Sequence, residues 1–193
     1  MQRLHILEDG QVDESKFDQL MGLFLAQDDG TEIVVDNGAA SFIPVCDYLI
    51  RNQAIELLQA EGHRVFAHSV VTGGLAFRDT LSGFDSLVSQ FPDGTQHILW
   101  TYRFFGDLEY QDKMFDELKV IQRHKDRLFG IIHIPKQDRL FASDMRTMLE
   151  NHQTFEDAAA DTSLGFMSRY RLSIIRDKTF QEIGSVLGAQ EHD

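Results

Sequence analysis

Three short apolar runs of the sequence are each followed by polar residues whose types could do chemistry. The first group, Asp36, Asn37 and Gly38, follows residues 33–35. In an open α/β sheet, ligands bind beyond the carboxyl ends of the strands, so a carboxylate there could hold a magnesium ion through a water molecule. The same residues also suit an ordinary turn, because Asp, Asn and Gly are common turn formers.

Two later groups suggest contacts with an anionic ligand. Thr72, Gly73 and Gly74 follow the second apolar run, where two glycines let the backbone approach a ligand and a following helix would offer free N–H groups. A purely structural Gly-Gly turn is the alternative. Thr101, Tyr102 and Arg103 follow the third run, residues 98–100, and the Arg103 guanidinium could contact phosphate or extend into solvent.

Several motifs that would define a catalytic or metal site are missing from these 193 residues. A P-loop needs a Gly-Lys pair followed by Ser or Thr, and none of the six lysines follows a glycine. The eight histidines show neither H-x-H nor H-x-x-x-H spacing, so we expect hydrogen-bonded structural histidines and no zinc site. Ser82 lacks the first glycine of the G-x-S-x-G pattern of serine hydrolases.

Composition limits the partners and the compartment. A formal net charge of −13 argues against direct nucleic-acid binding, which depends on Lys and Arg to neutralise phosphates. We interpret the basic residues at 123–127 and 169–178 as solvated helix faces, with an acidic partner as the alternative, and Cys46 as a small buried hydrophobe. Because no apolar run approaches about 20 residues and the N-terminus lacks a secretory pattern, we expect a cytoplasmic protein without membrane contact.

The hydrophobic pattern alternates between strands and helices up to residue 135. Short runs rich in β-branched residues predict parallel strands at residues 33–35, 65–71, 98–100 and 128–134, with a further strand at 4–7. Amphipathic spacing predicts helices at residues 12–25, 42–50, 81–91 and 114–121. We expect Ser41 to cap the second of these helices, Gly62 to end it, and the prolines to mark the ends of elements.

After residue 135 the pattern predicts only helices. One covers residues 141–149, one starts with a capping box at residues 154–157, and one runs from residue 163 and bends or breaks near Asp177. The expected fold class is α/β: a single domain, residues 1–193, with a mostly parallel sheet and helices on both faces in residues 1–135. Residues 136–193 form its helical C-terminal part.

The chain resembles TraL-type conjugal transfer proteins, which are similar to the ParA/MinD/CobQ group of plasmid-encoded P-loop ATPases. The residues that carry the resemblance form several separate stretches along the chain. They are IVVDNGAASFIP from Ile33, VVTGG from Val70, DTLSGF from Asp79, SQFP from Ser89, then Trp100, Gly106, Ile134-Pro135 and FEDA from Phe155.

The resemblance implies a P-loop NTPase-like fold whose first β-α unit is missing. Asp36 matches the Walker-B acid, which would be catalytic and hold magnesium through water. ATP and Mg²⁺ are expected only if the missing P-loop segment is supplied, and this chain alone is expected to need no cofactor. Tyr102 stands where relatives have an asparagine that contacts the base. The residues expected to bind the nucleotide are Asp36, Asn37, Thr72, Gly73, Gly74, Tyr102 and Arg103.

The expected function is that of an accessory protein of plasmid conjugal transfer that cannot bind or hydrolyse ATP unaided. Its partners would be other transfer or partition proteins and further copies of itself. One alternative is a truncated form of an active ATPase of plasmid transfer or partition. Another is a small α/β enzyme that pairs the strand-end Asp36 with His68 or Arg103 as acid and base.

The missing P-loop strand has a structural consequence. In the related architecture it lies beside the strand that ends at Asp36, so its absence leaves unpaired backbone groups at a buried edge. Such an edge invites pairing with another chain. We therefore expect a rearranged sheet or an oligomer formed across that edge.

Overall fold

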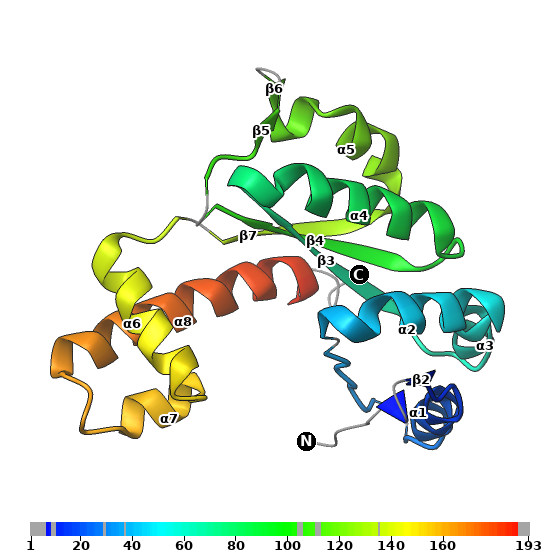
Figure 1. Cartoon of the computed structure of the whole chain (residues 1–193), viewed down its shortest axis with the longest axis horizontal. Coiled ribbons are helices and arrows are strands. Elements are labelled where there is room, and N and C mark those ends of the chain that lie inside the picture. Colours follow the sequence, from blue (N-terminus) through cyan, green and yellow to red (C-terminus); the bar gives the residue numbers. More distant parts are fainter. Residues whose placement is uncertain are drawn as a thin grey trace. The chain divides into compact units, whose positions relative to one another are not determined.

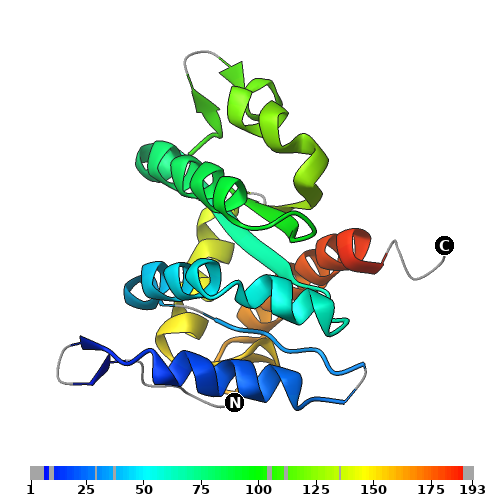
Figure 2. The same ribbon diagram turned by 90° about the vertical axis from the view of Figure 1, so that its right-hand side faces the viewer.

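The computed structural model describes residues 7–8, 11–28, 30–36, 38–103, 106–110, 113–134 and 136–188. The chain forms two compact units, and each is described separately. The first comprises residues 1–67 and 89–96, and the second comprises residues 68–88 and 97–193. Figures 1 and 2 show the helices and strands of both units.

The first unit contains an antiparallel pair of short strands and three helices. Its elements are β1 (Leu7–Glu8), β2 (Gln11–Val12), α1 (Ser15–Leu25), α2 (Ala39–Arg51) and α3 (Ala54–Ala60). A hydrophobic core joins the helices, and its buried residues are Phe17, Met21, Val45, Tyr48, Ala54 and Leu58. The Tyr48 hydroxyl donates to Asp18 Oδ1 at 2.5 Å, and Arg51 forms an ion pair with Glu14 at 2.6 Å, so polar contacts tie α2 to α1 and to the residue that precedes it.

The second unit contains most of a three-stranded parallel sheet in the order β3-β4-β7, of which the first two residues of β3 and the first of β4 are counted with the first unit. The strands are β3 (Phe66–Thr72), β4 (Gln96–Tyr102) and β7 (Leu128–Ile134). Register pairs run from His97 with Leu128 to Tyr102 with Ile134, with a shift between His97 and Ile98. The helix α4 (Phe77–Gln90) links β3 to β4, as expected for a parallel strand crossover.

Helices cover both faces of this sheet (Figure 1). On one face lie α4 and α5 (Lys119–His124), and with the sheet they bury the main core. The other face carries α8 (Phe166–Leu187), which approaches β7 so closely that a Cβ at Gly130 would lie 2.4 Å from Val186. The buried residues of the main core are Val71, Phe77, Phe84, Val88, Leu99, Leu108, Phe115, Leu118 and Ile121.

Short elements connect β4 to β7. They are the antiparallel pair β5 (Glu109–Tyr110) and β6 (Lys113–Met114), and 3-10 turns at Phe115–Glu117 and Lys125–Arg127 on either side of α5. A further 3-10 turn, Gly74–Ala76, lies between β3 and α4. After β7 come α6 (Arg139–Glu150), α7 (Phe155–Ala160) and α8, which share a second small core. Its buried residues are Met148, Ala158, Leu172 and Ile175. No helix in the described ranges is long and apolar enough to cross a membrane.

Several sequence predictions are confirmed. The strands expected at 65–71, 98–100 and 128–134 are β3, β4 and β7, and the α/β class with helices on both sheet faces holds. Thr154 and Asp157 form the predicted capping box at the start of α7, and Asp138 caps α6 by accepting from Leu140 N and Phe141 N. These predictions depended on local signals that the tertiary structure did not override.

The strand predicted at residues 33–35 is wrong. The described residues 31–36 have no regular secondary structure and are all exposed, with Val34 92% accessible. β-Branched residues favour an extended backbone, but a strand exists only where another strand supplies hydrogen-bond partners. Of the strand predicted at 4–7, residues 4–6 lie outside the described residues, and Leu7 belongs to the strand β1.

The start of α2 and the positions of Pro44 and Gly62 differ from the sequence prediction in their details. α2 begins at Ala39 with Gly38 at the N-cap, and the Ser41 hydroxyl donates back to Gly38 O instead of capping. Pro44 lies inside α2 and has no backbone N–H, so the helix lacks one hydrogen bond there. Burial of Val45 and Tyr48 of α2 in the core offsets that loss of stability. Gly62 follows α3, with a φ of +88° that suits glycine.

Two helices in the second unit also differ from prediction. The one expected at 114–121 is divided, because Met114 belongs to β6 and Leu118 has extended backbone between a 3-10 turn and α5. The break expected near Asp177 does not occur, and α8 continues through that residue. Packing of Leu172 and Ile175 on the α6–α7 pair stabilises one side of α8, which offsets the change in its hydrophobic register.

The ion pair between Arg171 and Asp144 should hold α8 to α6. The Arg171 Nε donates to Asp144 Oδ2 at 2.5 Å, and both side chains are mostly buried at 17% and 12% exposure. We expect Asp144→Ala to lower the free energy of unfolding by about 2 kcal/mol, because it leaves a guanidinium without its carboxylate. The exposed pair of Arg176 and Asp177 supplies the matched control, and Asp177→Ala should cost less than about 0.5 kcal/mol. Equal losses in urea denaturation followed by circular dichroism would contradict this assignment.

Candidate functional site

The carboxyl ends of β3 and β4 meet in the second unit. Gly73 N–H donates to Tyr102 O at 2.9 Å, which joins the two strand ends directly. Thr72 N–H donates to the Thr80 hydroxyl of α4 at 3.2 Å, and that hydroxyl donates to Ala76 O at 2.8 Å. The structure thus brings Thr72, Gly73 and Tyr102 together and ties the strand end to the helix that follows.

Glycine is required at this strand end by close packing of the backbone. A Cβ on Gly73 would lie 1.9 Å from Gly106 O, and a Cβ on Gly106 would lie 2.9 Å from Gly74 N. Gly74 and Gly106 also have positive φ, +76° and +152°, which L side chains rarely adopt. The space next to Gly73 is therefore occupied by the turn that follows β4, which favours the structural interpretation of the Gly-Gly pair.

The other residues predicted at these strand ends differ in exposure. Tyr102 is half-buried, and burial raises the pKa of its hydroxyl. Arg103 is exposed, and its backbone N–H donates to Ile134 O at 3.3 Å beyond the end of β7. The Arg103 guanidinium remains available to solvent, so contact with phosphate stays a prediction.

Asp36 does not stand at the end of a strand. It is an exposed residue of the irregular segment 31–36 in the first unit, whereas Thr72, Gly73 and Tyr102 belong to the second. Asn37 lies outside the described residues. The geometric reason for giving Asp36 a Walker-B role, an acid fixed at a strand end, is therefore lost, and a metal-binding role for it stays a prediction.

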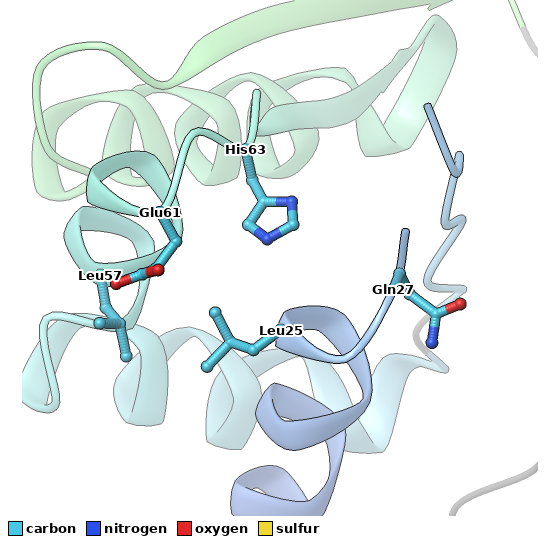
Figure 3. A pocket seen from close by; sticks show the side chains of 5 residues that line it. All are labelled: Leu25, Gln27, Leu57, Glu61 and His63. Carbon is cyan, nitrogen blue, oxygen red and sulfur yellow. The ribbon is translucent and has the colours of Figure 1, made fainter. Parts of the chain in front are cut away.

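A pocket of about 440 Å³ lies in the first unit and was not anticipated. Figure 3 shows it between the end of α1 and the end of α3, with the imidazole of His63 and the carboxylate of Glu61 at its border. Its lining residues are Leu25, Gln27, Leu57, Glu61 and His63. No local motif could have revealed it, because the lining comes from the ends of two helices far apart in sequence and from the residues that follow them. Within the described ranges, no three His, Cys, Asp or Glu residues are grouped to hold a metal.

Several histidines are structural, as predicted. The Trp100 indole N–H donates to His68 Nδ1 at 2.9 Å, and Thr101 Oγ1 lies 2.8 Å from His133 Nδ1. The buried His124 places Nε2 2.6 Å from Asp85 Oδ1 and packs edge-on against Phe84. Each of these rings connects two elements of the sheet or its covering helices.

The two basic stretches are largely engaged within the chain. In the first, Arg123 pairs with Asp85 at 3.2 Å and the Arg127 guanidinium donates to Val88 O. In the second, Arg171 pairs with Asp144, and Arg176 with Asp177. The contacts of Arg123, Arg127 and Arg171 join separate elements, whereas Arg176 and Asp177 are neighbours on α8. All four reduce the positive charge that an acidic partner could meet. Cys46 is half-buried, and burial raises the pKa of its thiol, which fits a packing role.

His97 should make stability depend on pH. It is fully buried in β4, and burial, followed by the nearby Arg127 and His124, lowers its pKa from 6.5 to about 4. As pH falls below 6.5, the unfolded chain binds a proton before the folded chain does, so this histidine progressively destabilises the fold down to about pH 4. We expect the unfolding free energy of His97→Gln to fall less steeply over that window than that of wild type. Parallel slopes in denaturation series at stepped pH would refute the assignment.

Replacing Gly73 should show that this turn is set by packing. Gly73→Ala is expected to lower the unfolding free energy by about 2–3 kcal/mol, because the new methyl group collides with backbone that cannot swing aside. Gly83, in the middle of α4, is the matched control, because a methyl group added there would meet no heavy atom within 4 Å. Gly83→Ala should be neutral or stabilise by up to about 1 kcal/mol. A well-tolerated Gly73→Ala in thermal melts would mean that the turn has room for a ligand.

Comparison with known proteins identifies two relatives. The chain is 39% identical over 184 residues to a protein TraL of Escherichia coli, an alignment that covers 95% of this chain and 76% of the relative. A second TraL of Escherichia coli is 38% identical over the same shares of both chains. No protein-family model and no solved structure matches the chain. At this identity and coverage, the chain belongs to the TraL family.

Proposed function

We propose that this TraL-family chain is an accessory protein of plasmid conjugal transfer whose α/β core is related to the ParA/MinD-like ATPases. The observation that carries the transfer role is the similarity to TraL, which is 39% identical in an alignment that covers 95% of the chain. The parallel sheet of the second unit, with a glycine turn between β3 and α4, is compatible with the proposed relation to those ATPases. The function would then be exerted through other transfer or partition proteins.

We further propose that these 193 residues do not hold ATP unaided. Phosphate binding in this class needs the Gly-Lys-Ser/Thr sequence, and the chain contains no Gly-Lys pair. Two structural observations support the proposal. The Gly73 turn is filled by Gly106 backbone, and Asp36 lies in an exposed irregular segment that gives a metal ion no fixed position. The chain would act by contact with partners and not by turnover.

Calorimetric titration with ATP and Mg²⁺ tests the nucleotide proposal. We expect no saturable heat for the wild-type chain and the same baseline for Asp36→Ala, since neither protein offers a phosphate cradle. A ParA-type ATPase with an intact P-loop, titrated under identical conditions, is the positive control. Magnesium-dependent saturable binding that Asp36→Ala abolishes would sink the proposal and restore Asp36 to a catalytic role.

Mating assays test the transfer role separately. Deleting the gene from its plasmid should lower transfer frequency, and expressing the chain in trans should restore it. Asp36→Ala should complement as well as wild type if no nucleotide chemistry is involved. Unchanged transfer after a clean deletion would contradict a role in conjugation whatever the nucleotide result.

A further inference from the structure

Trp100 of β4 and His68 of β3 form a hydrogen-bonded pair of side chains on one face of the sheet. The Trp100 indole N–H donates to His68 Nδ1 at 2.9 Å, and the ring centroids lie 6.0 Å apart. Leu99 packs in the main core, and the side chain of Trp100 points to the opposite face because side chains alternate along a strand. The pair therefore lies on the face away from α4 and α5, where His68 is exposed.

The chemistry of the indole fixes the protonation state of this histidine. An indole N–H can only donate a hydrogen bond, so the nitrogen that faces it must offer a lone pair. Nδ1 of His68 is therefore unprotonated, and the single proton of the neutral ring is on Nε2. A second proton would turn Nδ1 into a donor that faces the indole donor, and the hydrogen bond would be lost.

Two other histidines of the second unit have partners that tolerate a proton. His124 lies against the Asp85 carboxylate, which accepts a hydrogen bond from a neutral or a protonated ring. His133 lies against the Thr101 hydroxyl, which can rotate either to donate or to accept. The indole N–H has neither option, so protonation has a different consequence at the pair on the other face.

The groups around His68 favour its neutral form. Partial burial lowers the pKa of His68 below its usual value of 6.5, and within the described residues no charged group contributes to that shift. β3 itself has no Asp, Glu, Lys or Arg, and at its start the Arg64 guanidinium lies over the Phe66 ring at 5.7 Å. β4 places Tyr102 on the same face as Trp100. The central and C-terminal turns of α8, which packs on β7, carry Arg176, Asp177, Lys178 and Glu182.

We propose that the His68–Trp100 pair is a pH-sensitive latch between β3 and β4, which opens when His68 binds a proton. The step is the transfer of one proton from solvent to Nδ1, and it breaks the hydrogen bond with the indole. It also adds a positive charge to a strand that otherwise carries none, close to Val70, which is 53% exposed. Acid therefore releases the Trp100 side chain and changes the charge of this face. The latch does not depend on the proposed function.

Nuclear magnetic resonance of the ¹⁵N-labelled full chain tests the latch. Trp100 is the only tryptophan of the sequence, so it gives a single indole N–H signal. We expect this signal to shift along a one-proton titration curve whose midpoint lies below pH 6.5. At alkaline pH, long-range ¹H–¹⁵N spectra should show the His68 ring protonated at Nε2 alone. An indole signal that is unaffected by pH while the chain stays folded, or a neutral ring protonated at Nδ1, would overturn the proposal.

The variant His68→Gln separates the proton from the hydrogen bond. The glutamine amide oxygen can accept from the indole but does not titrate, so the indole signal should no longer depend on pH. His133→Gln is the matched control, because it removes a histidine from the opposite face and should leave the titration of the indole signal in place. Circular dichroism confirms that each variant is folded. An indole signal that titrates equally in His68→Gln and in wild type would assign the titration to another group and refute the latch.

Discussion

The second unit depends on β4 having a strand on each side. Its residues His97, Ile98 and Leu99 are completely buried, and Thr101 nearly so, which shields the backbone at these positions from water. Unpaired amide groups in that position would be costly, so β3 and β7 must both be present for the core to exist. The helices on the two faces then cover the apolar side chains that the strands display. Polar contacts such as that of His124 with Asp85 connect these helices to one another.

The same constraint explains the glycines at the strand ends. Once β3 and β4 are paired to their last residues, the turns that leave them are forced together, and Gly73 and Gly106 touch through their backbones. A side chain on Gly73 would push the turns apart and with them the ends of the strands. A sequence motif that looks like a ligand-binding loop can therefore arise from packing alone, and the phosphate contacts expected for Thr72 and Gly74 stay predictions.

Family membership and local geometry support different parts of the function. The identity to TraL covers nearly the whole chain, so the transfer role rests on residues spread over both units. The nucleotide chemistry of the proposed ATPase relatives would instead depend on a few residues at fixed places. Of these, Asp36 lies on an exposed irregular segment and Tyr102 occupies the place expected for an asparagine. A protein of this kind can keep its fold and contact surfaces while the chemistry is absent, because core packing and catalysis depend on different residues.

The sequence by itself determined the elements whose signals are local. β7 was predicted to the residue, and the capping box at Thr154 was recognised, because burial on both faces and helix capping are encoded by neighbouring residues. Only the tertiary structure decided whether residues 33–35 formed a strand, that Gly73 packs against Gly106, and which side chains lined the pocket beside His63. Each of these depends on a partner distant in sequence. A strand needs a neighbouring strand as its hydrogen-bond partner, and a site needs side chains from separate elements. A local sequence pattern does not specify which distant segment of the chain will lie next to it.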